Sequence, residues 1–307
     1  MAAVGDNNII RWYIYTGEVL EVIPDGTTHI TVAGDATVVR AGAFQGLRNI
    51  VEVICHEGVE KIGECAFCDC VKLRRVVMPG VKIVLESAFD GCRALTDVEC
   101  GKLEIIGRSA FTDCKSLGSI NLPSVRIVES SAFHVCGALE DVIFSNKLER
   151  IEGWAFCNCH SLEQMDIPLK DNLITAHDTF MGCKLLHYVD LIEGEVHETI
   201  AALQLEEWRN DMNEEIDSIN DILPNARAGY YLVERDYGDA GEKTQGIRRW
   251  IRSVLSKIIH YQAEHQRILE EASTTIQLAL SQDIVFNNIL PLLELPSHTF
   301  EVEERRR

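Results

Sequence analysis

A repeat of 22 to 24 residues constrains the fold of this chain more than any other feature of its sequence. An Ala-Phe pair marks each of six copies, and a Thr-Phe pair marks a degenerate seventh copy. The pairs are Ala43-Phe44, Ala66-Phe67, Ala88-Phe89, Ala110-Phe111, Ala132-Phe133, Ala155-Phe156 and Thr179-Phe180. A unit of this length cannot bury its own apolar face, so the repeat predicts a solenoid of stacked coils.

Other apolar residues recur at fixed distances from each phenylalanine, and we call each set of equivalent positions a column. Cysteine stands three residues after the phenylalanine in six of the seven copies, and leucine or isoleucine stands six residues after it. The ninth residue after it is Val53, Val76, Val98, Ile120, Val142, Met165 and Val189 in turn. The ninth and eleventh positions alternate with more polar ones, which predicts one strand per coil with a single buried face. Each column then becomes a continuous ladder inside the solenoid.

The repeat unit resembles a known family. The copy at 105–125, IIGRSAFTDCKSLGSINLPSV, is similar to the BspA-like leucine-rich repeat, which also occurs in treponemal surface proteins. The resemblance covers about residues 34–192 and implies a right-handed solenoid with its main sheet on the concave face. The whole layout is also similar to sets of intracellular repeat proteins of diatoms that carry a C-terminal helical tail. That second resemblance depends on residues 203–220 and 247–255, and it implies no activity.

We therefore predict an α+β protein, in which a right-handed leucine-rich repeat solenoid with a concave β-sheet is followed by a C-terminal α-helical hairpin. Residues 1–33 are expected to form an N-terminal cap, 34–196 a solenoid of about seven coils, and 197–307 the helical hairpin and a charged tail. A solenoid needs such caps because its terminal coils would otherwise expose the core.

Two amphipathic stretches predict the hairpin. Apolar residues recur every three or four positions from Ile200 to Leu223, where Pro224 ends the run, and again from Ile247 to Ile276. The first stretch is acidic and the start of the second is basic, which favours antiparallel packing. Two interpretations stay open: the hairpin covers the last coil, or residues 197–280 mediate oligomerisation or partner docking.

Charge and targeting signals limit the partners. The chain has 48 acidic and 29 basic residues and a net charge of -19, which opposes nucleic-acid or anionic-membrane binding. No stretch is long and apolar enough for a membrane span, and the N-terminus lacks the basic and apolar regions of a secretory signal. We expect an intracellular, cytoplasmic protein. Its 11 cysteines are then reduced thiols that pack as small hydrophobic residues.

No motif predicts catalysis, a cofactor or a metal. Cys65-x-x-Cys68 and Cys157-x-Cys159 have the spacing of zinc ligands, but the two clusters lie four coils apart, or about 19 Å. The segment from Gly238 to Thr244 is faintly similar to a phosphate-binding loop, yet its glycine spacing is wrong, and a polar turn is expected. No HExxH motif is present. We predict that the chain is not an enzyme and needs no cofactor or metal.

The outward face of the predicted strands is the most informative surface. Its fourteen positions, eight and ten residues after each phenylalanine, hold six acidic residues and one basic residue. The candidate binding residues are Glu52, Arg75, Asp97, Glu99, Asn121, Asp141, Gln164, Asp166, Tyr188 and Asp190. The face is either merely solvated or binds a basic segment of a protein. We predict a non-catalytic protein-interaction or scaffold module; the alternative is an exported surface recognition or adhesion protein, as the BspA-like resemblance implies.

Overall fold

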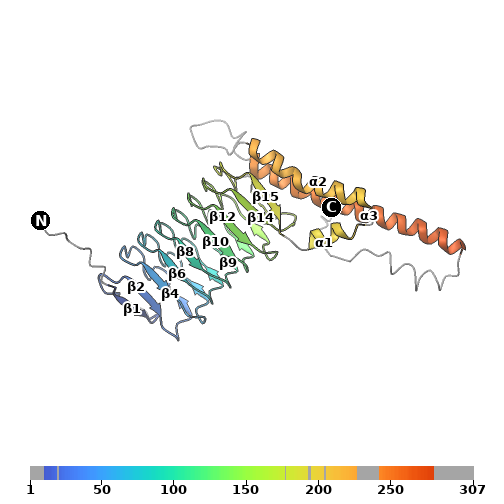
Figure 1. Ribbon diagram of the computed structural model, residues 1–307. Coiled ribbons are helices and arrows are strands. Elements are labelled where there is room, and N and C mark those ends of the chain that lie inside the picture. Colours follow the sequence, from blue (N-terminus) through green and yellow to red (C-terminus); the bar gives the residue numbers. More distant parts are fainter. Residues whose placement is uncertain are drawn as a thin grey trace.

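Parallel strands, stacked coil upon coil, form the body of the molecule (Figure 1). The computed structural model describes residues 10–18, 21–176, 178–192, 195–203, 205–226 and 242–279. The described coils make a β-solenoid of about seven turns. The terminal segment 281–307, with its predicted charged tail, and Gly238 and Gly241 of the predicted polar turn lie outside these ranges.

Each coil contributes one strand to a main sheet, and six coils also contribute a two-residue strand to a second sheet. The main-sheet strands, in spatial order, are β1 (Trp12–Tyr15), β2 (His29–Val32), β4 (Glu52–Ile54), β6 (Arg75–Val77), β8 (Asp97–Glu99), β10 (Ser119–Leu122), β12 (Asp141–Phe144), β14 (Gln164–Ile167) and β15 (Tyr188–Leu191). The second sheet contains β3 (Val38–Val39), β5 (Lys61–Ile62), β7 (Ile83–Val84), β9 (Ile105–Ile106), β11 (Ile127–Val128) and β13 (Arg150–Ile151). The ladder of the main sheet is interrupted between β8 and β10, whereas β9 and β11 pair without a break.

The strand register confirms the predicted columns. Val53 pairs with Val76, which pairs with Val98, and the same position continues from Val142 through Met165. Neighbouring coils therefore place equivalent residues side by side. The strand β1, which falls in the predicted N-terminal cap, pairs in parallel with β2 and extends the same sheet. The predicted domain limits near residues 33 and 196 stay predictions.

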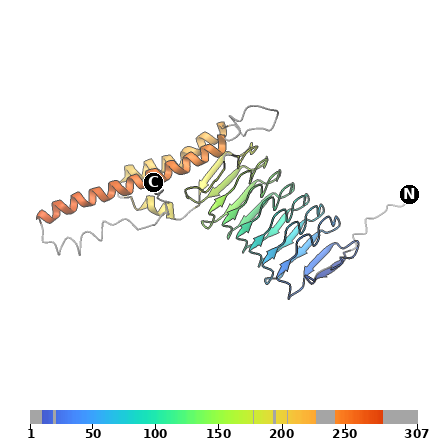
Figure 2. The same cartoon turned by 180° about the vertical axis from the view of Figure 1, so that it is seen from behind.

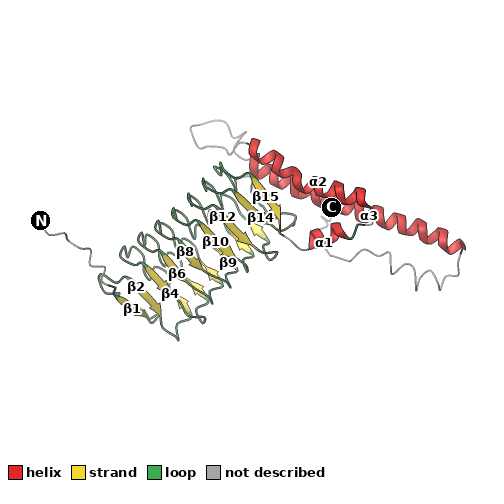
Figure 3. Cartoon of the chain, viewed as in Figure 1, coloured by secondary structure: helices red, strands yellow, loops and turns green. Residues whose placement is uncertain are grey.

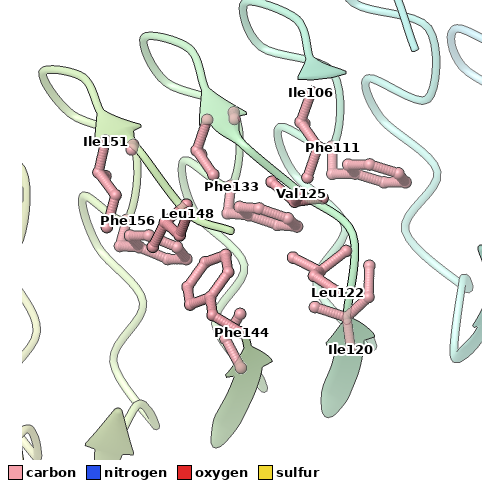
Figure 4. Close-up of a cluster of buried hydrophobic side chains, with 14 of the residues drawn as sticks. Ile106, Phe111, Ile120, Leu122, Val125, Phe133, Phe144, Leu148, Ile151 and Phe156 are labelled. Atoms are coloured by element: carbon pink, nitrogen blue, oxygen red, sulfur yellow. The ribbon is translucent and has the colours of Figure 1, made fainter. Parts of the chain in front are cut away.

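The phenylalanine column forms the centre of the core. Rings of successive coils stack with centroids 4.9 to 5.7 Å apart from Phe44 to Phe180. Figure 4 shows Phe111, Phe133 and Phe156 of this column. Each ring buries a large apolar area and contacts the next in near-parallel, stacked geometry. Tyr15 packs edge-on against Phe44, with centroids 4.9 Å apart, and ends the stack on the N-terminal side.

Two hydrogen-bond ladders join the coils beside this stack. From Phe44 to Phe156, each phenylalanine N–H donates to the carbonyl of the Ala or Thr that precedes the next phenylalanine, at 2.7 to 3.0 Å. In the opposite direction, the cysteine thiol of each coil donates to the phenylalanine carbonyl of the preceding coil, at 3.0 to 3.3 Å. The regular spacing of the cysteines in the repeats thus places a buried hydrogen bond, as well as a packed side chain, in each coil.

The turn after each phenylalanine requires a left-handed backbone conformation. The second residue after the phenylalanine has a φ of 57° to 79° in every copy, and glycine occupies three of these positions. Asp or Asn occupies three more, and both residue types tolerate this conformation. Val135, with φ 61°, is the β-branched exception. Its backbone is strained for a residue of that type.

Helices follow the last coil (Figure 3). They are α1 (Glu195–Ala201), α2 (Glu206–Ile222) with a single 3₁₀ turn at Leu223–Asn225, and α3 (Glu242–Ala279). The predicted first helix is therefore divided between α1 and α2, and Leu205, expected on its apolar stripe, is 44% exposed beside the break. Among the described residues, no helix is long and apolar enough to cross a membrane.

The two longer helices contact each other along α2. Trp250 Nε1 donates to the Glu215 carbonyl at 3.0 Å, and Lys257 Nζ lies 2.9 Å from Asp211 Oδ2. The Tyr261 ring stacks on Trp208, with centroids 5.1 Å apart. Residue numbers fall along α3 as they rise along α2, so the helices run in opposite directions where they touch. Seen from behind, α3 extends well past the start of α2 (Figure 2).

Candidate functional site

The outward-facing side chains of β4 to β15 form a surface that we call the strand face. It consists of the eighth and tenth residues after each phenylalanine, and none of these fourteen residues is buried. The ninth and eleventh residues point into the core, as the alternating burial of β10 and β14 shows. The structure therefore places every predicted binding residue on one accessible surface.

Arg75 partly compensates the negative charge of the N-terminal half of the strand face. Its guanidinium donates to Glu52 Oε1 at 3.0 Å on β4 and to Asp97 Oδ2 at 3.0 Å on β8. A third hydrogen bond joins it to Glu99. These three acids come from the coils on either side of Arg75, because a residue on a sheet reaches only neighbouring strands. Four of the predicted binding residues are thus engaged with one another.

The C-terminal half of the strand face keeps its negative charge. Asp166 on β14 is the register partner of Asp190 on β15, and Asp141 lies on the adjacent strand β12. Burial, with the nearby charges of Asp190 and Asp141, raises the pKa of Asp166 above its usual range. Among the described residues, no ion pair involves any of these three carboxylates. The charges that act on Asp166 are those of Asp190 and Asp141, and both are negative.

Polar and apolar side chains surround these acids. The Tyr188 hydroxyl donates to Asp190 Oδ2 at 3.0 Å, and Gln164 lies between Asp141 and Tyr188 in the register. Ile143 is 50% exposed and pairs in register with Asn121 on β10. We call the group of six residues on β12, β14 and β15 the acidic patch; it contains Asp141, Ile143, Gln164, Asp166, Tyr188 and Asp190.

The cysteines of the described part of the chain are separate thiols, most of them buried. All 11 are free thiols, and no cluster of three or more Cys, His, Asp or Glu residues could hold a metal ion there. Burial raises the pKa of Cys70 to about 12, and burial together with Asp69 and Asp90 raises that of Cys68 to about 11. These thiols are therefore protonated at neutral pH, which opposes nucleophilic chemistry.

The last coil is closed by residues that the sequence analysis did not single out for this role. Phe180 has no following coil, and its N–H donates instead to Thr244 Oγ1 at 3.1 Å. Lys243 is 3% exposed and donates to the carbonyls of Lys184 and Leu186. The start of α3 thus takes the place of an eighth coil.

The edge strand β15 is closed in the same way. The Val189 N–H, on the side where the next coil would pair, donates to Asn220 Oδ1 of α2 at 3.0 Å. The end of the repeat itself predicts a cap, because each buried backbone N–H of the last coil must find an acceptor outside the repeat. The identity of that acceptor does not follow from the repeat.

This arrangement defines a leucine-rich repeat solenoid with a helical C-terminal extension. The chain belongs to the BspA type leucine rich repeat family, whose model matches residues 26–125 and 83–196, with six copies. The matched ranges span more than half of the chain. No curated protein matches it.

Several solved structures are similar to this chain. A leucine-rich repeat protein of T. pallidum is 27% identical over 53% of this chain and 69% of its own, with a TM-score of 0.41. A leucine-rich repeat protein of Bacteroides ovatus is 20% identical over 54% and 69%, with a TM-score of 0.34. The pneumococcal vaccine antigen PcpA is 14% identical over 59% and 65%, with a TM-score of 0.29.

Proposed function

We propose that this chain is a non-catalytic protein-interaction module whose acidic patch binds a basic segment of a partner protein. The observation that supports the proposal is the uncompensated charge of Asp141, Asp166 and Asp190 on three neighbouring strands. Burial raises the pKa of Asp166, and the charges of Asp190 and Asp141 raise it further; a positively charged partner would offset that repulsion. Exposed Ile143 and Tyr188 add apolar area beside the charges, as protein-binding surfaces require.

The binding site proposed here is the C-terminal half of the strand face. The acids in the N-terminal half already share one guanidinium, so a partner would gain little from replacing Arg75. The acidic patch would lie on the concave side of the solenoid, as the family resemblance implies. Its charge favours a protein with Lys or Arg side chains over nucleic acid or an anionic membrane.

We also propose that α2 and α3 form an antiparallel hairpin that caps the solenoid. The contacts of Thr244, Lys243 and Asn220 with the last coil support this role. Oligomerisation through 197–280 stays a prediction. An intracellular location is part of the proposal as well, and it is supported by the thiol ladder, because each ladder cysteine must keep its S–H to donate.

A peptide array of Lys- and Arg-rich segments tests the binding proposal. The strongest binder is measured against the native chain, against Asp141→Asn/Asp166→Asn/Asp190→Asn, and against Glu52→Gln/Asp97→Asn/Glu99→Gln. Both variants remove three negative charges from the strand face, so they are matched in net charge. We expect about tenfold weaker binding for the first and less than about twofold for the second, with affinity falling as salt rises.

Two outcomes contradict the proposal. Equal loss in both variants would mean that the peptide senses only net charge. Peptides in which Lys and Arg are replaced by Gln and that bind as tightly as the originals would remove the electrostatic basis altogether.

A further inference from the structure

The two ends of the main sheet differ in how their edges are closed. At the C-terminal end, Asn220 accepts the outward N–H of Val189, and the start of α3 covers the last coil. At the N-terminal end, β1 is the outermost described strand, and it pairs only with β2. Edge strands present unpaired backbone groups that can bind another strand.

The hydrogen bonds of β1 show which of its groups point away from the sheet. The carbonyls of Arg11 and Tyr15 accept hydrogen bonds from β2 and its flanking residues. Backbone groups alternate along a strand, so those of Trp12 and Ile14 point outward. The next outward N–H, that of Thr16, donates to Glu21 at 2.9 Å. Among the described residues, no hydrogen-bond partner lies on the outer edge for the N–H and C=O groups of Trp12 and Ile14.

The same two residues expose apolar side chains. Trp12 is 53% exposed and Ile14 is 64% exposed, while Tyr15 on the opposite side of the strand is 2% exposed. The Trp12 ring packs against His29, with centroids 4.8 Å apart. On the core side, the Tyr13 hydroxyl donates to Glu21 at 2.7 Å, so this side is closed by the chain itself. The open part of β1 is therefore its backbone edge with the adjoining apolar side chains.

Charge distribution favours a second copy of this chain at that edge. Residues 1–50 hold five acidic and three basic residues, out of 48 and 29 in the whole chain. The acidic patch lies at the other end of the sheet, on β12, β14 and β15. Two copies joined through β1 would keep their most acidic surfaces far apart, whereas most other contacts between copies would bring like charges together.

We propose that two copies of this chain associate through antiparallel pairing of their β1 strands. With a two-fold axis beside Tyr13, Trp12 of one copy stands opposite Ile14 of the second copy, and the reverse holds as well. Residues opposite each other in a hydrogen-bonded antiparallel pair exchange both N–H···O bonds, so the outward groups of Trp12 and Ile14 satisfy one another. The aromatic and β-branched side chains then meet across the strands, which is a favourable pair. The interface is isologous, as in most homodimers.

The small interface sets the expected affinity. Only three β1 residues of each copy, Trp12 to Ile14, stand opposite one another, so the buried area falls well below that of an obligate dimer. We expect a dissociation constant in the micromolar range, about 10 to 100 µM. The monomer and the dimer should therefore both be visible within an ordinary concentration series.

Sedimentation velocity of the full chain tests the proposal. The variant Ile14→Pro removes the outward N–H, and Pro is tolerated on an edge strand where that N–H bonds to nothing. The variant Ile14→Lys adds a charge at the edge, and Val22→Lys adds the same charge at a residue that is 83% exposed and outside β1. We expect dimers for the native chain and Val22→Lys, and at least about tenfold weaker dimers for both Ile14 variants.

Several results would overturn the proposal. A native chain that stays monomeric up to about 500 µM would do so, since the expected affinity lies well below that concentration. Equal weakening by Val22→Lys would assign the effect to charge alone, and a dimer unaffected by Ile14→Pro would place the interface elsewhere. Amide exchange of the native chain is independent of any variant. The Trp12 and Ile14 amides should become more protected as concentration rises, and unchanged protection would contradict strand pairing.

Discussion

The clearest test of the C-terminal cap is the substitution of Thr244. Its hydroxyl accepts the Phe180 N–H at 3.1 Å, and the two residues are 1% and 2% exposed. Thr244→Val keeps the shape of the side chain and removes the acceptor. The Phe180 N–H is then buried without a partner, since no following coil offers a carbonyl.

The expected cost follows from this geometry. A buried donor left without an acceptor lowers the free energy of unfolding by about 1–3 kcal/mol. Thr244→Ser keeps the acceptor and loses one buried methyl group, which costs about 0.8 kcal/mol. Thr275, exposed on the same helix, donates to the Glu271 carbonyl at 2.9 Å. Its replacement by valine should change stability by less than about 0.5 kcal/mol.

Amide hydrogen exchange is the appropriate measurement, because repeat arrays need not unfold in one step. In Thr244→Val, the Phe180 amide should exchange about 5 to 150 times faster than in the native chain. The Phe89 amide, which donates to the Ala110 carbonyl at 2.8 Å inside the solenoid, serves as the internal reference and should change little. Denaturant unfolding of all three variants gives the accompanying loss of stability.

Two results would refute the reasoning. The first is a Thr244→Val protein as stable as Thr275→Val. The second is unchanged exchange at Phe180 despite a loss of stability, because the loss would then arise somewhere other than the last coil.

Three further predictions follow from the ladder, the acidic patch and the turns. Burial raises the pKa of Cys114 well above its usual value, so above about pH 8.5 the unfolded chain binds fewer protons than the folded one and stability falls with pH. Cys114→Ala should make this fall shallower by up to about 1.4 kcal/mol per pH unit in urea unfolding at pH 8 to 10, and an identical slope would contradict the buried-thiol account. Asp166→Asn should raise Tm at pH 7, because the raised pKa of Asp166 means that its charged form is disfavoured in the folded state; the gain should vanish below about pH 3.9, where the carboxyl is protonated in both states. Asp97→Asn, which breaks a pair with an arginine, should lower Tm instead, and the same sign for both would disprove the division of the strand face. Val135→Gly should stabilise the chain by about 1 kcal/mol, because φ is 61° there and Gly91 adopts the same turn without strain; a lower denaturant midpoint would show that side-chain burial outweighs backbone strain.

The solenoid was predictable because each coil repeats the same burial problem. A column such as Phe67, Phe89 and Phe111 is fully buried in every copy, so periodicity in the sequence translates directly into periodicity in space. The parallel pairing of equivalent residues follows from the same period. The left-handed turns were not predicted, because Asp, Asn and even Val share that position with glycine.

The acidic surface was only partly predictable. Its residues were identified from the repeat positions. A total of six acids and one base over fourteen positions does not show which of the acids lie next to the base. Charges on a sheet interact mainly with adjacent strands, and Arg75 lies between the coils of Glu52 and Asp97. The distinction between a half whose acids are paired with arginine and a half whose acids are unpaired therefore depends on which coil holds the single base.

The capping residues were beyond the repeat pattern altogether. Thr244 lies 64 residues after Phe180, across residues with no repeat period, so only the folded chain brings them together. The break between α1 and α2 is similar, because Leu203 is buried and Leu205 is exposed within what reads as one apolar stripe.

The two opposed hydrogen-bond ladders bear on how proteins of this kind change in length. Every internal junction between coils offers the same donors and acceptors, one set from the phenylalanine amide and one from the thiol of the following coil. Duplicating or deleting a whole coil therefore recreates a junction that already exists. The contacts that differ lie at the two ends, where Tyr15 packs edge-on against Phe44 and the Thr244 hydroxyl accepts the Phe180 N–H. Recombination within the gene could lengthen or shorten the binding surface one coil at a time while the same pair of ends serves each version.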